Sequence, residues 1–365
     1  MAKFAFFDGK IVPIDEAKIS IMTHAFNYGT GVFEGIRAYW NKEKQQLFVF
    51  KLGEHYDRFR KSCRILKIGL PYTTKGLCDI TLDLLRLEGY REDSYVRPIA
   101  YKASEGIGVR LHDLKDGFTV FAVVFGKYID KEEGARAAVS SWRRVDDNAV
   151  PARAKVTGIY VNSALSKTEA VERGFDEAIV LTQDGHVSEG SAENIFLVRD
   201  GSLVTPAATE NILEGITRST IMEIAKAELG IGTIERQIDR SELYVADELF
   251  FCGTGCQIAA VIEVDGRDVG SGKIGPVTEK LRKLYFDIAR GSVAKYRDWC
   301  TPVYGKGGGA KAHGIQAAPR IKPEPRAKAL AAKMAQRRKS KPRPKVSQAP
   351  KAGPLIKSRP PRSRR

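Results

Sequence analysis

Residues 150–194 constrain the fold of this chain most, because they predict a loop, a helix and a hairpin with one reactive group at each end. Lys155 lies in a short loop after Pro151, ahead of the helix predicted by VTGIYVNSAL. EAIVLT and HVSEG follow as strands joined by an Asp-Gly turn. Glu189 ends this hairpin inside the turn-rich string SEGSAEN. The segment therefore predicts a mixed helix and strand region that carries a lysine and a carboxylate on separate elements.

A lysine and an acid placed in this way are the two protein groups that a pyridoxal phosphate enzyme needs. The amine forms a Schiff base with the cofactor aldehyde, and the acid pairs with the pyridinium nitrogen so that the ring accepts electrons. Small and apolar neighbours favour a desolvated amine at Lys155. Glu189 has a competing role as a turn or N-cap residue, and Glu193 is a rival for the buried acid. The sequence leaves that choice open.

Two glycine-led turns are candidate phosphate sites. Gly215-Ile216-Thr217 opens a predicted helix, so its amide N–H groups and the helix dipole favour an anion. Gly253-Thr254-Gly255 follows the strand ELFFC and offers a hydroxyl and further amides. Arg58, on the helix predicted for residues 54–68, is a candidate counter-charge. Each turn alone is more typical of an ordinary element boundary, and Arg58 alone is more typical of a solvated helix residue.

Tyr95 and Arg97, in the strand SYVRP, are candidate ligands for a carboxylate. They stand two residues apart, so their side chains share one face of the strand. A phenol and a guanidinium on one face suit a carboxylate. An arginine before a proline also serves as a clamp between domains.

The net charge of +16 is confined to the C-terminal end of the chain. Residues 305–365 contain ten Lys, nine Arg and one Glu, so they carry +18, and the remaining residues carry −2. This end is rich in Pro, Ala and Gly and poor in apolar residues, which predicts a disordered tail. Such a tail allows salt-dependent, non-specific association with nucleic acid, and the lack of aromatic residues argues against base stacking. A solvated appendage with no selected role is the alternative.

Cysteine usage and hydropathy predict a cytoplasmic protein without a metal centre or a membrane span. The five cysteines are scattered, which argues against a disulfide framework. FCGTGC lacks the spacing and the second ligand pair of a zinc site. No apolar run approaches the roughly 18 residues needed to cross a bilayer, and the N-terminus lacks a signal-like apolar stretch.

The order of the predicted elements divides the chain into four regions. Residues 1–126 form a smaller α/β domain, and the polar residues 127–134 form a linker between domains. Residues 135–304 form a larger, mostly β domain with helices, which carries Lys155. The tail of residues 305–365 follows. A chain of 365 residues has room for about two such domains.

These strings together resemble the branched-chain amino-acid aminotransferases, which are fold-type IV (class IV) pyridoxal phosphate enzymes. The resemblance covers residues 4–304. It rests on HAFNYGTGVFEGIRAY, EHYDRF, YVRP, EGIGVR, AKVTGIY, SEGSAEN, EGITR and CGTG, in the family's order. It implies a two-domain α+β (α/β) fold like that of D-amino-acid aminotransferase. It also implies a homodimer or larger homo-oligomer.

The resemblance assigns roles at the cofactor. Lys155 forms the Schiff base and shuttles the substrate α-proton, Glu189 pairs with the pyridine nitrogen, and Tyr160 binds the cofactor O3′. Four residues hold the phosphate and one lies against the ring: Arg58, Ile216, Thr217 and Thr254, with Leu213 on the ring.

The resemblance also assigns the substrate pocket. Arg97 takes the distal carboxylate of glutamate or 2-oxoglutarate, while Tyr95 and the Thr254-Gly255 turn take the α-carboxylate. The side-chain pocket is walled by Phe33, Tyr95 and Tyr128, together with Tyr28 and Val109 of a partner subunit.

The implied activity is ping-pong amino-group transfer between Leu, Ile or Val and 2-oxoglutarate. The alternatives on the same fold are a D-amino-acid aminotransferase and an aminodeoxychorismate lyase. YVRP and GVFEGIR favour the branched-chain enzymes. Phe125, where many bacterial relatives carry Trp, and Cys256-Gln257 after the GTG turn depart from the usual pattern and bear on the acceptance of aromatic substrates.

Overall fold

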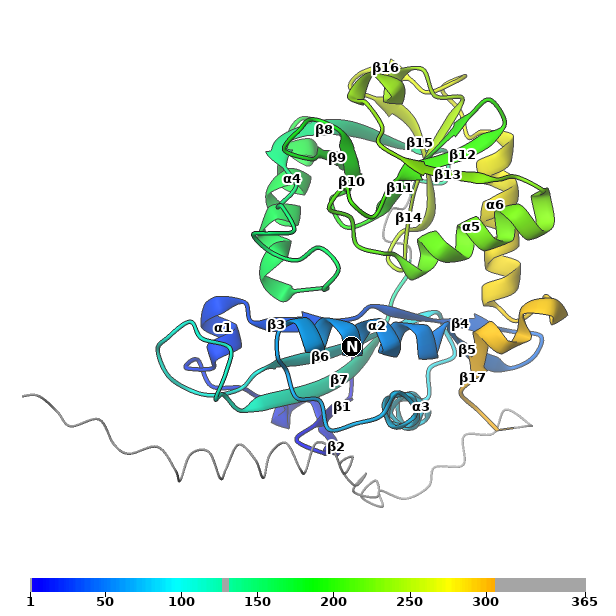
Figure 1. Cartoon of the computed structure of the whole chain (residues 1–365). Coiled ribbons are helices and arrows are strands. Elements are labelled where there is room, and N and C mark those ends of the chain that lie inside the picture. The colour runs from blue at the N-terminus through cyan, green and yellow to red at the C-terminus, as the bar shows by residue number, and fades with distance from the viewer. Residues whose placement is uncertain (1, 127–130, 306–365) are drawn as a thin grey trace, which may run out of the picture.

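The computed structural model describes residues 2–126 and 131–305, and these form two β-sheets with helices packed on both (Figure 1). The predictions made for Tyr128, for linker residues 127–130 and for the tail from residue 306 lie outside the described residues. The predicted mixture of helices and strands in two sheet regions is confirmed.

The first sheet is antiparallel and has the strand order β17-β5-β4-β6-β7-β1-β2, with β3 paired to β6. β6 carries Tyr95 and Arg97, and its nine-residue pairing with β7 fixes their register. The strands are β1 Phe4–Phe7, β2 Lys10–Pro13, β3 Gly31–Phe33, β4 Ile36–Asn41, β5 Gln46–Phe50, β6 Ser94–Lys102, β7 Asp116–Val124 and β17 Cys300–Pro302. β17 brings the end of the described chain back to this sheet, beside β5.

The second sheet is mixed and has the order β10-β9-β8-β15-β14-β11-β12-β13, with β16 paired to β15. β8 runs parallel to both of its neighbours, and most other pairs are antiparallel. The strands are β8 Ala135–Arg143, β9 Glu177–Leu181, β10 Val187–Gly190, β11 Asn194–Arg199, β12 Ser202–Pro206, β13 Thr233–Arg236, β14 Glu248–Gly253, β15 Gln257–Val264 and β16 Arg267–Asp268.

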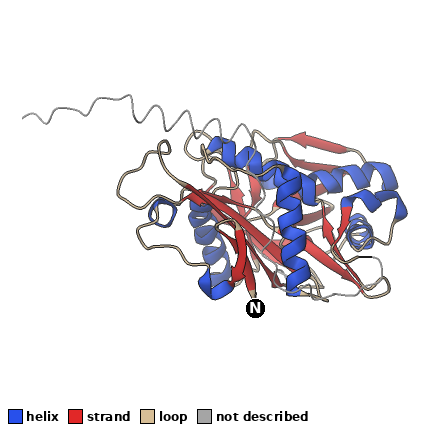
Figure 2. Ribbon diagram, turned by 90° about the horizontal axis from the view of Figure 1, so that it is seen from below, coloured by secondary structure: helices blue, strands red, loops and turns tan. Residues whose placement is uncertain are grey.

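Helices flank both sheets, and Figure 2 shows them against the strands. They are α1 His24–Tyr28, α2 Leu52–Ile65, α3 Thr74–Glu88, α4 Tyr160–Glu172, α5 Ile216–Leu229 and α6 Pro276–Ala289. α2 ends earlier than the predicted residue 68 because Lys67 adopts a left-handed conformation with φ of 53°. α3 begins at an N-cap where the Thr73 side chain accepts from the Gly76 amide.

The loop that carries Lys155 joins the two halves of the molecule. Its neighbours Ala154 and Val156 belong to the same buried cluster as Val32 and Phe59 of the first sheet region. The helix that follows, α4, packs instead on β8 and β9 of the second sheet. Lys155 therefore lies where the two regions meet, held from one side by the first core and from the other by α4.

Candidate active site

A cavity of about 710 Å³ opens between the two sheet regions. Both sheets and the helices between them contribute to its wall. Twelve of the residues predicted for the site line it, namely Phe33, Arg58, Tyr95, Arg97, Lys155, Tyr160, Glu189, Leu213, Ile216, Thr217, Thr254 and Gly255. The tertiary fold therefore brings together groups that are spread over more than 200 residues of sequence.

Lys155 is fixed in the cavity wall by its backbone. Its carbonyl accepts from the Phe33 amide at 3.0 Å, and its own amide donates to the Ser62 hydroxyl at 3.2 Å. These bonds attach the loop to β3 and α2. The Lys155 amine lies 5.2 Å from the centre of the Phe33 ring and 5.5 Å from that of Tyr160. The flexible side chain thus has a fixed origin and two aromatic walls.

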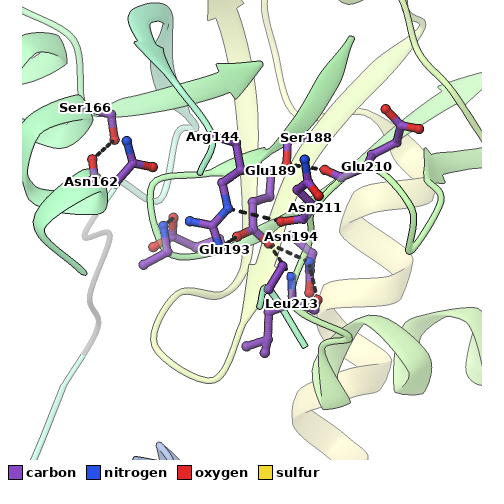
Figure 3. Close-up of polar contacts among 12 residues, drawn as sticks. Arg144, Asn162, Ser166, Ser188, Glu189, Glu193, Asn194, Glu210, Asn211 and Leu213 are labelled. Atoms are coloured by element: carbon purple, nitrogen blue, oxygen red, sulfur yellow. Dashed lines mark hydrogen bonds and ion pairs between the residues drawn. The ribbon is translucent and has the colours of Figure 1, made fainter. Parts of the chain in front are cut away.

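Glu189 is buried on β10, at a bulge in the pairing between β10 and β9. Arg144 forms an ion pair with its Oε1 at 2.8 Å. The Asn194 amide group and the Leu213 backbone N–H donate to Oε2 at 3.2 and 3.1 Å. Figure 3 shows the carboxylate between Arg144 on one side and Asn194 and Leu213 on the other. A carboxylate accepts about four hydrogen bonds, so one position is left for a donor from the cavity.

Burial raises the pKa of Glu189 above its ordinary value, and Arg144 and the Leu213 amide offset part of that shift. Arg144 is a site residue that the sequence analysis missed. Its guanidinium is held in turn by the Asn211 carbonyl, which accepts from Nε at 3.1 Å. Nothing in the string SSWRRV marks Arg144 as different from a surface arginine. Only the arrangement of the second sheet brings it to Glu189.

Glu193, the rival acid, is also buried and lines the same cavity. Its Oε2 accepts from the Ala192 amide at 2.9 Å. Burial, with the nearby Glu177 carboxylate as a second cause, raises the pKa of Glu193 to about 8. Glu193 is therefore mostly protonated near neutral pH, whereas Glu189 has an arginine to stabilise its charged form. This contrast favours Glu189 as the anion that faces a cationic ligand nitrogen.

The N-terminus of α5 forms one end of the cavity. Gly215 is the N-cap, and Gly215, Ile216 and Thr217 all line the cavity. The first amides of a helix have no partner within the helix and carry its positive dipole, so they suit an anion. A Cβ on Gly215 would lie 2.0 Å from the Asn194 amide oxygen, which explains the glycine. Thr254, on the turn between β14 and β15, lies in the same wall.

Arg58 adds a cation to this end of the cavity. Its Nη1 donates to the Glu214 carbonyl at 2.9 Å, beside the N-cap of α5. Its Nε and Nη2 donate to the two carboxylate oxygens of Glu34 at 2.7 and 2.8 Å. The guanidinium thus connects α2 with the start of α5. Glu34 is a second residue that the sequence analysis missed.

Arg37, on β4, holds the turn between β14 and β15 from behind. It is buried, and its guanidinium donates to the carbonyls of Thr254 and Gly255 at 3.2 and 3.1 Å. It also donates to the carbonyls of Phe125 and Gly126 at the end of β7. Because C=O and N–H point in opposite directions across a trans peptide, the following amide N–H groups point away from Arg37. This arrangement keeps those donors available to a ligand carboxylate.

The predicted carboxylate ligands on β6 lie together. Arg97 Nη2 donates to the Tyr95 hydroxyl at 2.9 Å, and the guanidinium stacks 4.4 Å from the centre of the Phe33 ring. Arg97 Nε is buried without a hydrogen-bond partner among the described residues. A buried N–H of this kind is costly unless a ligand satisfies it. Both residues line the cavity, so their shared face is directed into it.

Tyr28 and Val109 lie apart from the wall of this cavity, at the surface of the first sheet region. The Tyr28 hydroxyl accepts from the Gly108 amide at 3.1 Å, and Val109 is 77% exposed. The sequence-based prediction is that both residues wall the pocket of a partner subunit.

Within the described residues, no group of three or more metal-ligating side chains and no helix capable of spanning a membrane is found.

Comparison with known proteins identifies the family. Residues 31–264 match the family model described as amino-transferase class IV. A probable branched-chain-amino-acid aminotransferase of Aquifex aeolicus is 50% identical over 303 residues, which cover 83% of this chain and 97% of that protein.

Two solved structures are similar over the same part of the chain. The branched-chain aminotransferase of Thermoproteus uzoniensis with norvaline is 46% identical, with a TM-score of 0.80, and the match covers 83% of this chain and all of that one. The branched-chain amino acid aminotransferase of Thermobaculum terrenum in its PLP form is 34% identical, with a TM-score of 0.80 and coverages of 83% and 99%. The chain therefore belongs to the class IV aminotransferases.

Proposed function

We propose that this chain is a pyridoxal-phosphate-dependent branched-chain-amino-acid aminotransferase. It exchanges the amino group between L-Leu, L-Ile or L-Val and 2-oxoglutarate in a ping-pong reaction. The observation that carries this proposal is the convergence of Lys155 and Glu189 with two candidate anion sites in one cavity. These sites are the N-terminus of α5 beside Arg58 and the Tyr95-Arg97 pair. The similar proteins of Aquifex aeolicus and Thermoproteus uzoniensis support the choice of substrates.

The residues in the cavity fit pyridoxal phosphate. Lys155 would bind the aldehyde carbon, Tyr160 would bind O3′, and Glu189 would accept from the ring nitrogen. The α5 N-terminus, Arg58 and Thr254 would hold the phosphate, and Leu213 would lie against the ring. When bound, this cofactor supplies an electrophilic carbon and a ring that accepts electrons from the substrate α-carbon.

Lys155 has two tasks in this reaction: it holds the cofactor, and it moves a proton to and from the substrate α-carbon. Its backbone bonds to Phe33 and Ser62 keep the amine within reach while the side chain swings. Glu189 keeps a proton on the ring nitrogen because its own charge is stabilised by Arg144. Phe33 and Tyr160 place aromatic rings beside the amine.

The pocket explains how one site accepts an apolar side chain and a second carboxylate in turn. Apolar residues line the pocket around Arg97, namely Phe33, Ile99, Phe121, Val123 and Phe125. They suit the side chain of leucine, isoleucine or valine. Arg97 takes the distal carboxylate of glutamate through its unpartnered Nε. Tyr95 and the amides of the Thr254-Gly255 turn take the α-carboxylate that all these substrates share.

The proposal also includes the assembly of this chain into a homodimer. Two neighbouring surface segments expose large apolar side chains, and a backbone hydrogen bond from Gly106 to Met22 joins them. The exposed residues are Ile19, Ile21, Met22, Phe26, Ile107 and Val109. A contiguous exposed apolar patch of this kind is typical of a protein interface. The Tyr28 and Val109 predicted for a partner's pocket lie in the same two segments.

The test compares substrates in the wild type and in Arg97→Met. We expect the wild type to use Leu, Ile and Val with 2-oxoglutarate and to leave D-Ala unused. The variant should raise the KM for glutamate and 2-oxoglutarate at least about tenfold, since it loses a charge-assisted contact. The KM for leucine should change far less. Turnover of D-Ala, or equal losses for leucine and glutamate, would contradict the proposal.

A further inference from the structure

Glu34, His55 and Arg58 form a polar cluster beside the cavity. Arg58 lines the cavity, whereas His55 and the fully buried Glu34 lie behind it. Glu34 Oε1 accepts from Arg58 Nε at 2.7 Å, and Oε2 accepts from Arg58 Nη2 and from His55 Nδ1, each at 2.8 Å. Neither Glu34 nor His55 lines the cavity, so any effect on a ligand passes through Arg58.

We propose that Glu34 and His55 are positioning residues that aim the Arg58 guanidinium at the cofactor phosphate. This inference rests on the proposed role of Arg58 as a phosphate ligand.

The hydrogen bonds of Arg58 leave a defined part of its guanidinium for a phosphate. An arginine has five N–H groups. Glu34 occupies one on Nε and one on Nη2, and the Glu214 carbonyl occupies one on Nη1. One N–H on each of the two terminal nitrogens is left. Because the fork is planar, a bidentate hold by Glu34 fixes the direction of both.

His55 holds Glu34 rather than adding charge. Burial lowers the pKa of His55 below its ordinary value, although Glu34 opposes the shift. The ring is therefore neutral at physiological pH, and its Nδ1–H donates to Glu34 Oε2. This third hydrogen bond prevents the Glu34 carboxylate from rotating away from the arginine. The histidine thus supports the acid, and the acid supports the arginine.

The charges of the cluster indicate that its contribution to phosphate binding is geometric. Burial alone raises the pKa of Glu34, but Arg58 and the hydrogen bonds from His55 and Arg58 outweigh it and hold that pKa far below its usual range. Glu34 is therefore always an anion, and it cancels the charge of Arg58. A negative charge behind the arginine weakens its attraction for a phosphate. Glu34 therefore fixes the direction of the Arg58 guanidinium, although its charge weakens the attraction between Arg58 and a phosphate.

One face of α2 connects this cluster to the lysine loop. His55, Arg58 and Ser62 are three and four residues apart, so they follow one another along that face. Ser62 accepts from the Lys155 amide at 3.2 Å. The same helix therefore sets the position of the phosphate arginine and of the reactive lysine. Because these contacts hold α2 itself in place, the Arg58 guanidinium can change direction by itself only when Glu34 is removed.

The experiment measures the affinity of the full-length chain, freed of cofactor, for pyridoxal phosphate and for pyridoxal, which lacks the phosphate. The readout is the dissociation constant for pyridoxal divided by that for pyridoxal phosphate, both determined by absorbance titration. In Glu34→Gln we expect weaker binding of pyridoxal phosphate by at least about tenfold, because an amide offers one acceptor in place of two. Pyridoxal affinity should stay within about twofold.

Three further variants make the result decisive. His55→Leu should lower the same ratio, and His55→Asn should restore it, because Asn keeps a donor near the position of Nδ1. Glu263→Gln is the matched control, since it removes the carboxylate from another bidentate pair, with Arg136, on the second sheet away from the cavity. It should leave the ratio unchanged. Arg58→Met should lower the ratio at least as far as Glu34→Gln.

The possible outcomes separate the inference from the proposal beneath it. Tighter or unchanged binding of pyridoxal phosphate in Glu34→Gln would overturn the inference, because charge would then outweigh direction. Equal losses for both ligands would also overturn it by revealing general damage. If Arg58→Met leaves the ratio unchanged, Arg58 is no phosphate ligand, and both the proposed role and the inference are wrong. If Arg58→Met lowers the ratio and Glu34→Gln does not, the inference is wrong and the proposed role of Arg58 stands.

Discussion

The two ends of the cavity each carry an arginine–glutamate ion pair, in different arrangements. At the α5 end, Arg58 lines the cavity and Glu34 stands behind it. At the β10 end, Glu189 and Arg144 both line the cavity, and the acceptor position left on Glu189 is on Oε1, the oxygen that Arg144 also holds. A guanidinium in front suits a phosphate dianion, and a carboxylate in front suits a protonated ring nitrogen. One cofactor with an anion at one end and a cation at the other matches both.

The pKa shifts show that the two pairs also differ in strength. The pKa of Glu34 is lowered, because Arg58 and His55 together outweigh its burial. The pKa of Glu189 is raised, because its burial outweighs Arg144 and the Leu213 amide. Glu34 is thus held as an anion, whereas at Glu189 burial prevails over the stabilising contacts. The comparison teaches that burial sets the direction of the pKa shift unless the partners of the acid outweigh it.

Glu189→Gln is the substitution for which we expect the largest loss of activity. A neutral amide cannot keep a proton on the ring nitrogen, so the developing charge in the transition state loses its counter-ion. We expect kcat to fall on the order of a hundredfold, with the cofactor still bound through the other end. Stopped-flow measurement of the half-reaction with leucine gives the rate. An unchanged kcat would transfer the role to Glu193.

Arg144→Met should have a smaller and pH-dependent effect. Without its partner, the buried Glu189 has a still higher pKa and takes up a proton over a wider pH range. Activity should therefore be lost first at low pH and recover as the pH rises, and we expect kcat at pH 7 to fall roughly tenfold. A pH profile of kcat from pH 6 to pH 9.5 checks this. A uniform loss at every pH would mean that Arg144 acts only on the fold.

Glu193→Gln should leave catalysis nearly intact and change the pH dependence of stability. The pKa of Glu193 is raised to about 8 in the folded chain, so between its unfolded value and about 8 the folded state binds more protons. Its contribution to stability is full below the unfolded pKa and is lost as the pH rises through about 8. The variant should therefore lose less Tm than the wild type between pH 6 and pH 9. Parallel Tm curves would contradict this assignment.

The sequence predicted the residues whose role depends on a local pattern. Lys155 precedes a helix, Gly215 opens another, and Tyr95 and Arg97 alternate along a strand, so each signal lies within a few residues. The strand and helix content followed from hydrophobic period and from Asp-Gly turns in the same way. The predicted helix of residues 54–68 extends too far, because α2 ends before Lys67, which adopts a left-handed conformation. The spacing of apolar residues does not reveal such a conformation.

The residues that the sequence analysis missed are those whose partners lie on other elements of the fold. Arg144 reaches Glu189 only because β8, β9 and β10 lie side by side in one sheet. Arg37 reaches Thr254 and Gly255 across the boundary between the two sheet regions. Glu34 gains its partners from the next helix. In each case the contact is a product of sheet register and packing, so the surrounding string carries no local signal for it.

Borohydride reduction followed by peptide mapping tests the central assignment most directly. Lys155 is the lysine whose amine lies in the cavity between Phe33 and Tyr160, and its loop is tied to both sheet regions. We expect reduction of the purified protein to attach the cofactor to Lys155, and we expect Lys155→Ala to abolish both the label and transamination while the fold is retained. A label on Lys167 or on any other lysine would contradict it.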